Sequence, residues 1–142
     1  MRELRPGLFQ GDISDLNLLK LDDARTKLKF TLVVNVGSTN FIPPNIWAVH
    51  VPMMVSSREE DNDWQKVIHT VSLAGGEVER GGKVLVTCDA GISRSAVFCG
   101  LVISWMEGIP MDDKLLQRMK NRNPAIDPLP ELWAEAAQRA YC

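Results

Sequence analysis

Runs of mostly apolar residues, rich in β-branched side chains, recur along this chain and predict the strands of a sheet. Three such runs cover residues 30–36, 47–53 and 83–87, and Leu8–Gln10 predicts a short edge strand. The run at 30–36 is apolar at nearly consecutive positions, which is typical of a parallel strand that is buried on both faces. The pattern therefore favours a sheet whose two faces are covered.

Segments with a helical period lie between these strands. In the clearest one, apolar residues between Trp64 and Val71 recur at spacings of three and four. The paired glycines at 75–76 and 81–82 predict a loop or a helix end between them. Further helices are predicted at residues 14–21, 22–28 and 94–107, after the capping residue Asp112, and from Leu132 to Ala140.

Strands that alternate with helices predict an α/β fold. We expect a single domain over residues 1–142, with a central, mostly parallel sheet flanked by helices on both faces. A length of 142 residues suits one ordinary domain, and 45% hydrophobic residues supply its core. Functional sites in such folds lie at the C-terminal ends of the strands, so the residues after the strand at 83–87 are the first candidates.

Cys88 follows the last predicted strand, and Arg94 comes six positions later. Gly91 lies in the loop between them, and Arg94 and Ser95 open the long apolar helix. The N-terminus of a helix presents backbone N–H groups and positive potential to an anion. A thiolate and a guanidinium at the two ends of this loop would share that anion site. The arrangement suits attack by sulfur on a phosphate ester.

Each residue type has a physical reason for its place. A helix N-terminus and a nearby cation lower the pKa of a thiol, which favours the nucleophilic thiolate. Arg94 can hold two phosphate oxygens, and the hydroxyl of Ser95 can hydrogen-bond the sulfur when it leaves. The remaining oxygens would contact the backbone N–H groups of the loop residues Asp89, Ala90, Gly91, Ile92 and Ser93. A cysteine that is only a small buried hydrophobe would not account for these neighbours.

The run from Val84 to Ser95 resembles the signature loop of cysteine-based protein phosphatases, within the dual-specificity branch. Low-molecular-weight tyrosine phosphatases carry a similar loop near the N-terminus, so the mid-chain position of Cys88 argues against them. Further segments resemble the dual-specificity family, and together they span nearly the whole chain: Leu8–Asp12, Leu32–Val36, Asn121–Pro124 and Asp127–Pro128. The resemblance implies a cysteinyl-phosphate intermediate and a phosphorylated protein or peptide as substrate, with phosphotyrosine and possible phosphoserine or phosphothreonine activity.

Two positions depart from the family pattern. Thr87 stands where the family usually has a histidine that helps to stabilise the thiolate, so Cys88 is expected to be less acidic than usual. The second position is that of the general acid, an upstream aspartate in the family, which aligns here near Ser57. The nearby carboxylates are Glu59, Glu60, Asp61 and Asp63.

Asp61 is our prediction for the acid that protonates the leaving oxygen. The alternative is a solvated acidic loop that supplies no acid, with Asp63 as the N-cap of the next helix. The choice among the four carboxylates, or none, stays open at this stage.

Most of the remaining histidine, cysteine and tryptophan residues are expected to have structural roles. His50 lies in a strand with no second ligand at metal spacing, and His69 lies on the polar side of its helix. Cys99 is expected in the core, with a protective disulfide from Cys99 or Cys142 to Cys88 as the alternative. Tryptophans 105 and 133 are expected to pack between helices. The family resemblance implies that Arg122 either contacts the surroundings of the substrate phosphate or braces the signature loop.

Charge and composition narrow the setting. The formal net charge of −2 gives no general attraction to nucleic acid or to an anionic membrane. Residues 1–6 lack the apolar core of a signal peptide, and no apolar run is long enough to span a bilayer. Three cysteines do not make a full disulfide framework. We therefore expect a cytoplasmic, monomeric enzyme without metal or cofactor and without nucleic-acid or membrane partners.

Other functions stay open on the sequence. One is a phosphate-binding, pseudophosphatase-like module with little turnover, which Thr87 and the unassigned acid suggest. Another is a phosphatase for a non-protein phosphoester, such as an inositol lipid or an RNA 5′ end. The loop contains Asp89 and no lysine, and this would repel highly charged substrates. A sulfur-transfer enzyme of the rhodanese type is a further alternative.

Overall fold

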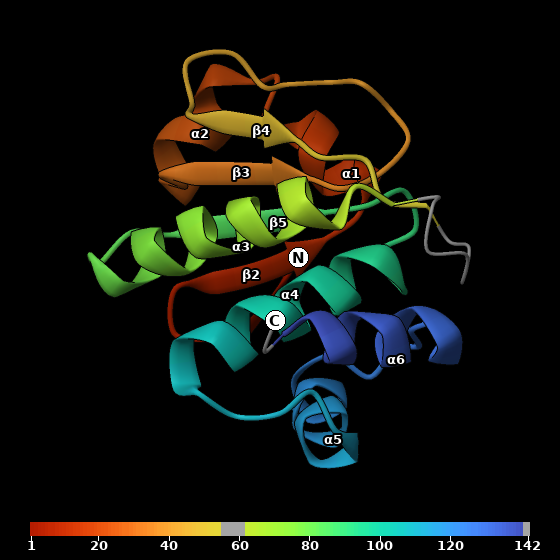
Figure 1. The fold of residues 1–142 in the computed structure, drawn as a ribbon. Helices are drawn as coiled ribbons and strands as arrows, with labels where there is room; N and C mark the ends of the chain where they lie inside the picture. Colours follow the sequence, from red (N-terminus) through yellow and green to blue (C-terminus); the bar gives the residue numbers. More distant parts are fainter. Residues whose placement is uncertain (55–61, 141–142) are drawn as a thin grey trace.

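A five-stranded sheet forms the centre of the computed structural model, within the residues that it describes, 1–54 and 62–140 (Figure 1). In their order across the sheet, the strands are β1 (Arg2–Arg5), β2 (Leu8–Gly11), β5 (Val84–Thr87), β3 (Leu32–Asn35) and β4 (Ala48–His50). All neighbouring strands are parallel except the antiparallel pair β1 and β2. The predicted mostly parallel sheet is confirmed.

The prediction of an edge strand at Leu8–Gln10 is wrong, because β2 has a neighbour on each side. β5 pairs with it in parallel and β1 pairs with it antiparallel, after a turn in which Gly7 has a φ of 86°. Only Leu4 of β1 is apolar, so the sequence has no apolar run at this position to indicate a strand. The added strand leaves Gln10 inside the sheet, with 1% of its surface exposed.

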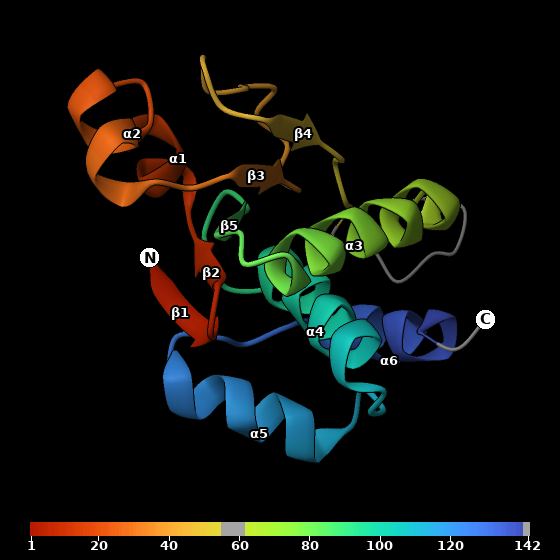
Figure 2. The same cartoon turned by 90° about the vertical axis from the view of Figure 1, so that its left-hand side faces the viewer.

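Helices cover both faces of the sheet, as predicted (Figure 2). One face carries α1 (Ile13–Leu18) and α2 (Asp22–Leu28); the other carries α3 (Trp64–Glu79), α4 (Arg94–Glu107), α5 (Asp113–Arg122) and α6 (Pro130–Arg139). The side chains of each strand alternate between these two layers. Val33 and Leu85 pack with Leu16 of α1 and with Leu19 after it. Val34 and Val86 join the larger cluster around the buried α4.

The α3 helix continues through Gly75 and Gly76 and ends at Glu79, so the helix end lies between the two glycine pairs, as predicted. Close packing between α3 and α4 explains the first glycine. A Cβ atom at Gly75 would lie 2.4 Å from the Trp105 ring, so only hydrogen fits at this position. Trp105 therefore packs between helices as expected, although 44% of its surface is exposed. Trp133 is buried, also as expected.

The carboxyl ends of β3 and β5 lie side by side. The backbone N–H of Val36 donates to the carbonyl of Thr87, at 2.8 Å, and the N–H of Met53 donates to the carbonyl of Val36, at 3.0 Å. The loop that begins at Cys88 therefore starts next to the segments that follow β3 and β4. This is the sheet edge at which the sequence predicted the site.

None of the helices in residues 1–54 and 62–140 combines the length and the apolar content needed to cross a membrane.

Candidate active site

Cys88 directly follows β5 and is buried, with 3% of its surface exposed. Its Sγ is 3.3 Å from the backbone nitrogen of Gly91, which donates to it, and 3.1 Å from the Oγ of Ser95. A backbone N–H and a hydroxyl that both reach one sulfur can stabilise a thiolate. The predicted proximity of Cys88 and Ser95 is therefore present in the structure.

Gly91 has two reasons to be glycine. Its φ of 69° lies in the left-handed region, which side chains disfavour. A Cβ atom there would also lie 3.1 Å from the Cβ of Asp12 and 3.2 Å from the carbonyl oxygen of Gly11. The loop thus packs against the junction of β2 and α1, where Asp12 forms a capping box with Asp15. This junction fixes the loop from outside.

Gln10 connects three parts of the chain behind the loop. Its Nε2 donates to the carbonyl of Gly91 and to the Oγ of Ser95, each at 2.8 Å. Its Oε1 accepts from the Nδ2 of Asn123, also at 2.8 Å. Sequence reasoning assigned no role to Gln10 or Asn123, yet both lie inside the segments that resemble the phosphatase family. A buried amide in an apolar strand was the available signal.

Arg94 is held at the first turn of α4 by three hydrogen bonds. Its Nη1 donates to the Oγ of Ser38, at 2.9 Å, and to the carbonyl of Met53, at 3.3 Å. Its Nη2 lies 2.9 Å from the Oδ2 of Asp89. Only 11% of the side chain is exposed, so the guanidinium has a fixed orientation. Ser38 and Met53 were not predicted, because nothing near them in the sequence points to Arg94.

Asp89 contributes its side chain to this arrangement as well as its backbone. Burial disfavours the charged form, but the hydrogen bond and charge of Arg94 and the N–H groups of Ser38 and Thr39 outweigh it, so the pKa of Asp89 is lowered. A Cβ atom on Gly37 would lie 2.5 Å from Oδ1 of Asp89, so this glycine leaves room for the carboxylate. Asp89 is therefore ionised at neutral pH.

The other predicted loop residues occupy the turn between β5 and α4. Ala90 and Ile92 are exposed at its rim, and the carbonyl of Ile92 accepts from the backbone N–H of Asp127, at 3.1 Å. The Oγ of Ser93 accepts from the N–H of Leu129, at 3.0 Å. These outward contacts tie the loop to the segment before α6. They leave the side chain of Ser93 engaged away from Cys88.

Asp61, Glu59 and Glu60 lie outside the described residues, so the predicted general acid stays a prediction. Asp63 is described, and its carboxylate accepts from the backbone N–H of Lys66, at 3.1 Å. Asp63 is thus the N-cap of α3, which was the alternative prediction for this residue. The described part of the chain therefore gives one of the four candidates a structural task.

Thr87 is fully covered beside the nucleophile, with 1% of its surface exposed. Its Oγ1 is buried and has no hydrogen-bond partner among the residues that the structure describes. A buried hydroxyl without a partner costs free energy. The departure from the family's usual histidine thus leaves an unsatisfied polar atom next to the reactive loop.

Arg122 does not brace the signature loop, so that part of the expectation is wrong, whereas a contact near the substrate phosphate stays a prediction. Its Nε donates to the carbonyl of Glu3, at 3.2 Å, which ties α5 to β1. The next residue, Asn123, supports the loop instead. Its buried side chain donates to Gln10, which in turn contacts the loop.

The remaining candidates have structural surroundings. The Nε2 of His50 is 2.8 Å from the carbonyl of Gly37, and His69 is exposed on α3. Cys99 is completely buried, and this burial, with the nearby Cys88, raises the pKa of its thiol well above the ordinary value. Cys99 is therefore a neutral core residue, and Cys142 lies outside the described residues. No cluster of potential metal ligands occurs within 1–54 and 62–140.

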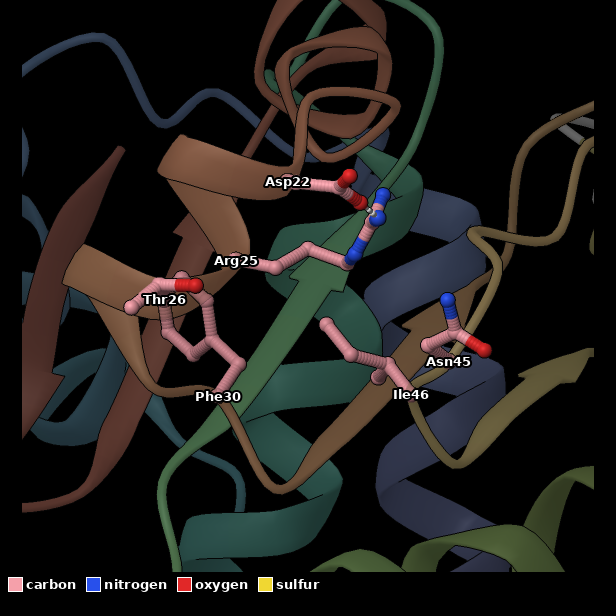
Figure 3. Close-up of a pocket in the computed structure, with 6 residues that line it drawn as sticks. All are labelled: Asp22, Arg25, Thr26, Phe30, Asn45 and Ile46. Atoms are coloured by element: carbon pink, nitrogen blue, oxygen red, sulfur yellow. Dashed lines mark ion pairs between the residues drawn. The ribbon is translucent and has the colours of Figure 1, made fainter.

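A separate pocket lies between α2 and the segment before β4 (Figure 3). Asp22 and Arg25 line it and form an ion pair with each other. Phe30 and Ile46 form part of its wall. It contains no cysteine and lies apart from the Cys88 loop.

Comparisons with known proteins support the same conclusion. No family model matches the sequence. The curated human and mouse proteins named serine/threonine/tyrosine-interacting protein are each 34% identical over 105 residues, which cover 69% of this chain and 46% of theirs. The chain thus spans about half the length of the curated relatives it matches.

Solved structures match over nearly the full chain. Human DUSP28 superposes with a TM-score of 0.82 at 24% identity, covering 99% of this chain and 96% of that chain. The human tyrosine phosphatase-like serine/threonine/tyrosine-interacting protein superposes with a TM-score of 0.79 at 25% identity, covering 97% and 93%. Together with the sheet order and the loop between β5 and α4, these matches establish that this chain has the dual-specificity phosphatase fold of the protein tyrosine phosphatase superfamily.

Proposed function

We propose that this chain is a cysteine-dependent phosphatase that hydrolyses phosphotyrosine in a protein or peptide. Phosphoserine and phosphothreonine are further candidate substrates. The observation that carries the proposal is the environment of one sulfur. Cys88 Sγ receives the N–H of Gly91 and faces the hydroxyl of Ser95, in a loop that ends with the guanidinium of Arg94. Few structural roles require a cysteine with this set of neighbours.

In the first step, the thiolate of Cys88 attacks phosphorus and the bond from phosphorus to the ester oxygen breaks. Arg94 and the loop N–H groups hold the equatorial oxygens, where negative charge develops. The leaving oxygen takes a proton from a general acid, for which Asp61 is our proposal. An aryl oxygen leaves readily even without that proton.

In the second step, water attacks the phosphorus of the cysteinyl-phosphate, and the bond from sulfur to phosphorus breaks. The sulfur leaves as a thiolate. Gln10 donates to the Oγ of Ser95 and occupies one of its lone pairs, so the proton of that hydroxyl is available to the sulfur. Ser95 thus stabilises the leaving thiolate, and phosphate is released.

The direct test is hydrolysis of p-nitrophenyl phosphate by the natural chain and by Cys88→Ser. The proposal expects turnover that Cys88→Ser abolishes. Cys99→Ser is the matched control, because it changes a buried cysteine of α4 that lies outside the loop; it should keep most of the activity. Full activity in Cys88→Ser would refute the proposed mechanism.

The second candidate is a module that binds phosphorylated partners with little turnover. Two observations favour it: a structural neighbour is named phosphatase-like and interacting, and Asp63 is engaged as a helix cap. It predicts that vanadate or a phosphotyrosine peptide binds in calorimetry while p-nitrophenyl phosphate is not hydrolysed. That result would replace the enzyme proposal with this one.

A further inference from the structure

The hydrogen bonds that Arg94 makes within the protein determine which of its N–H groups stay available to a ligand. An arginine side chain has five N–H bonds in one plane. Two from Nη1 point to Ser38 and Met53, and one from Nη2 points to Asp89. The Nε–H and the second N–H of Nη2 have no partner among the residues that the structure describes. These two belong to neighbouring nitrogens, and such a pair suits two oxygens of one phosphate.

Asp89 is itself fixed from the opposite side. The backbone N–H of Ser38 donates to both of its carboxylate oxygens, at 3.3 Å and 3.4 Å. The turn that carries Ser38 is closed by Asn35, whose Oδ1 accepts from the N–H of Gly37 and whose Nδ2 donates to the carbonyl of Thr39. A chain of polar contacts therefore runs from the end of β3 through Asp89 to Arg94.

We infer that Asp89 is a positioning residue, which orients the guanidinium of Arg94 toward the phosphoryl group and offsets part of its positive charge. The inference rests on the proposed function, in which this loop binds a phosphoryl group. The carboxylate is the only acidic side chain of the loop, and its ion pair with Arg94 measures 2.9 Å. The Asp89 carboxylate thus orients the guanidinium of Arg94 but weakens the attraction of the site for an anionic ligand.

The consequence is a site that discriminates by ligand charge. A carboxylate within a few ångströms of the bound phosphoryl group repels each further negative charge of the ligand. A monoester with one phosphate suffers this repulsion least. The substrate class that the geometry favours is therefore a singly phosphorylated group, such as an isolated phosphorylated side chain, over a polyphosphate.

Binding of inorganic phosphate and of pyrophosphate, measured by calorimetry, tests this inference. Asp89→Asn keeps an oxygen that can accept from Arg94 and Ser38 but removes the charge. It should bind phosphate about threefold or more tightly than the natural chain, and its gain for pyrophosphate should be larger. Asp89→Ala also loses the anchor of Arg94, so it should bind both anions more weakly than Asp89→Asn.

Asp127→Asn is the matched control, because Asp127 is exposed and its hydrogen bond to the loop comes from the backbone N–H, which the substitution keeps. It changes the net charge equally, and its effect on both anions should be small. Three results would overturn the inference: no gain for phosphate in Asp89→Asn, equal affinities in the Asn and Ala variants, or the same gain in Asp127→Asn. Binding is measured without turnover, so a failure of the proposed enzyme activity would be seen separately, in the Cys88→Ser assay.

Discussion

The hydroxyl of Ser95 lies between the nucleophile and an amide: its Oγ is 3.1 Å from Cys88 Sγ and 2.8 Å from Gln10 Nε2. Because Gln10 can only donate through Nε2, the serine proton is directed toward the sulfur when that sulfur is a thiolate. The arrangement matters most when the sulfur becomes a leaving group, since the negative charge then returns to it.

Ser95→Ala should slow release of phosphate from the cysteinyl-phosphate more than its formation. Loss of a hydrogen bond to a charged group is worth about 2 kcal/mol, or roughly thirtyfold in rate. Rapid mixing with p-nitrophenyl phosphate should then show a burst of p-nitrophenol followed by slow steady turnover. Ser104→Ala alters another buried serine of α4, which bonds the carbonyl of Ile109, and should show no such burst. Equal slowing of both phases in Ser95→Ala would contradict the assigned role.

Thr87→Val should stabilise the protein. Valine has the shape of threonine, so the change leaves the packing intact and removes an Oγ1 that has no hydrogen-bond partner in the described part of the chain. We expect a gain of about 1 kcal/mol in the free energy of unfolding. Thr70→Val provides the comparison, because the Oγ1 of Thr70 is buried but donates to the carbonyl of Lys66, at 2.9 Å. That variant should lose stability in urea denaturation. A loss in both variants would mean that the hydroxyl of Thr87 is satisfied after all.

Two adjacent glycines of α3 should respond in opposite ways to alanine. Gly75→Ala places a methyl group against the Trp105 ring and should cost about 1–2 kcal/mol of stability. At Gly76 the nearest atom to an added Cβ is Nη1 of Arg80, at 3.4 Å, on a flexible side chain. Gly76→Ala should therefore gain about 0.5–1 kcal/mol from improved helix propensity. Thermal unfolding of the pair measures both, and a stabilising Gly75→Ala would refute the close packing.

Acid should remove the stabilising contribution of Asp89. Its pKa is lowered in the folded state from an ordinary value of 3.8. The contribution is therefore fully present above that unfolded value and is lost as pH falls through the folded value. The difference in unfolding free energy between the natural chain and Asp89→Asn should stay constant from about pH 8 to about pH 5 and shrink below about pH 4. A difference that grows on acidification would contradict the ion pair with Arg94.

The fold and the centre of the site were predictable because both depend on local pattern. Apolar runs identified four of the strands, and the segment from Cys88 to Ser95 identified the loop. β1 escaped because a mostly polar edge strand has no apolar run, and it is held by pairing with β2. The close approach of Gly75 to the ring of Trp105 also could not be predicted, because the two residues are distant in sequence.

The supporting contacts of the site were harder to predict for the same reason. Ser38 and Met53 reach Arg94 only because β3, β4 and β5 end at one edge of the sheet. Asn123 reaches the loop through Gln10, more than a hundred positions earlier in the chain. A single sequence does not state which residues meet across such separations. The folded structure is needed to identify these contacts.

The link from Asn123 to Gln10 also has a consequence for the timing of activity during synthesis. The loop around Cys88 is braced by β2 from the beginning of the chain and by the residue that follows α5. A nascent chain that has passed residue 95 already contains the nucleophile, but it lacks this brace until residue 123 has left the ribosome. The loop around Cys88 therefore acquires its full set of supporting contacts only after residue 123 has been synthesised.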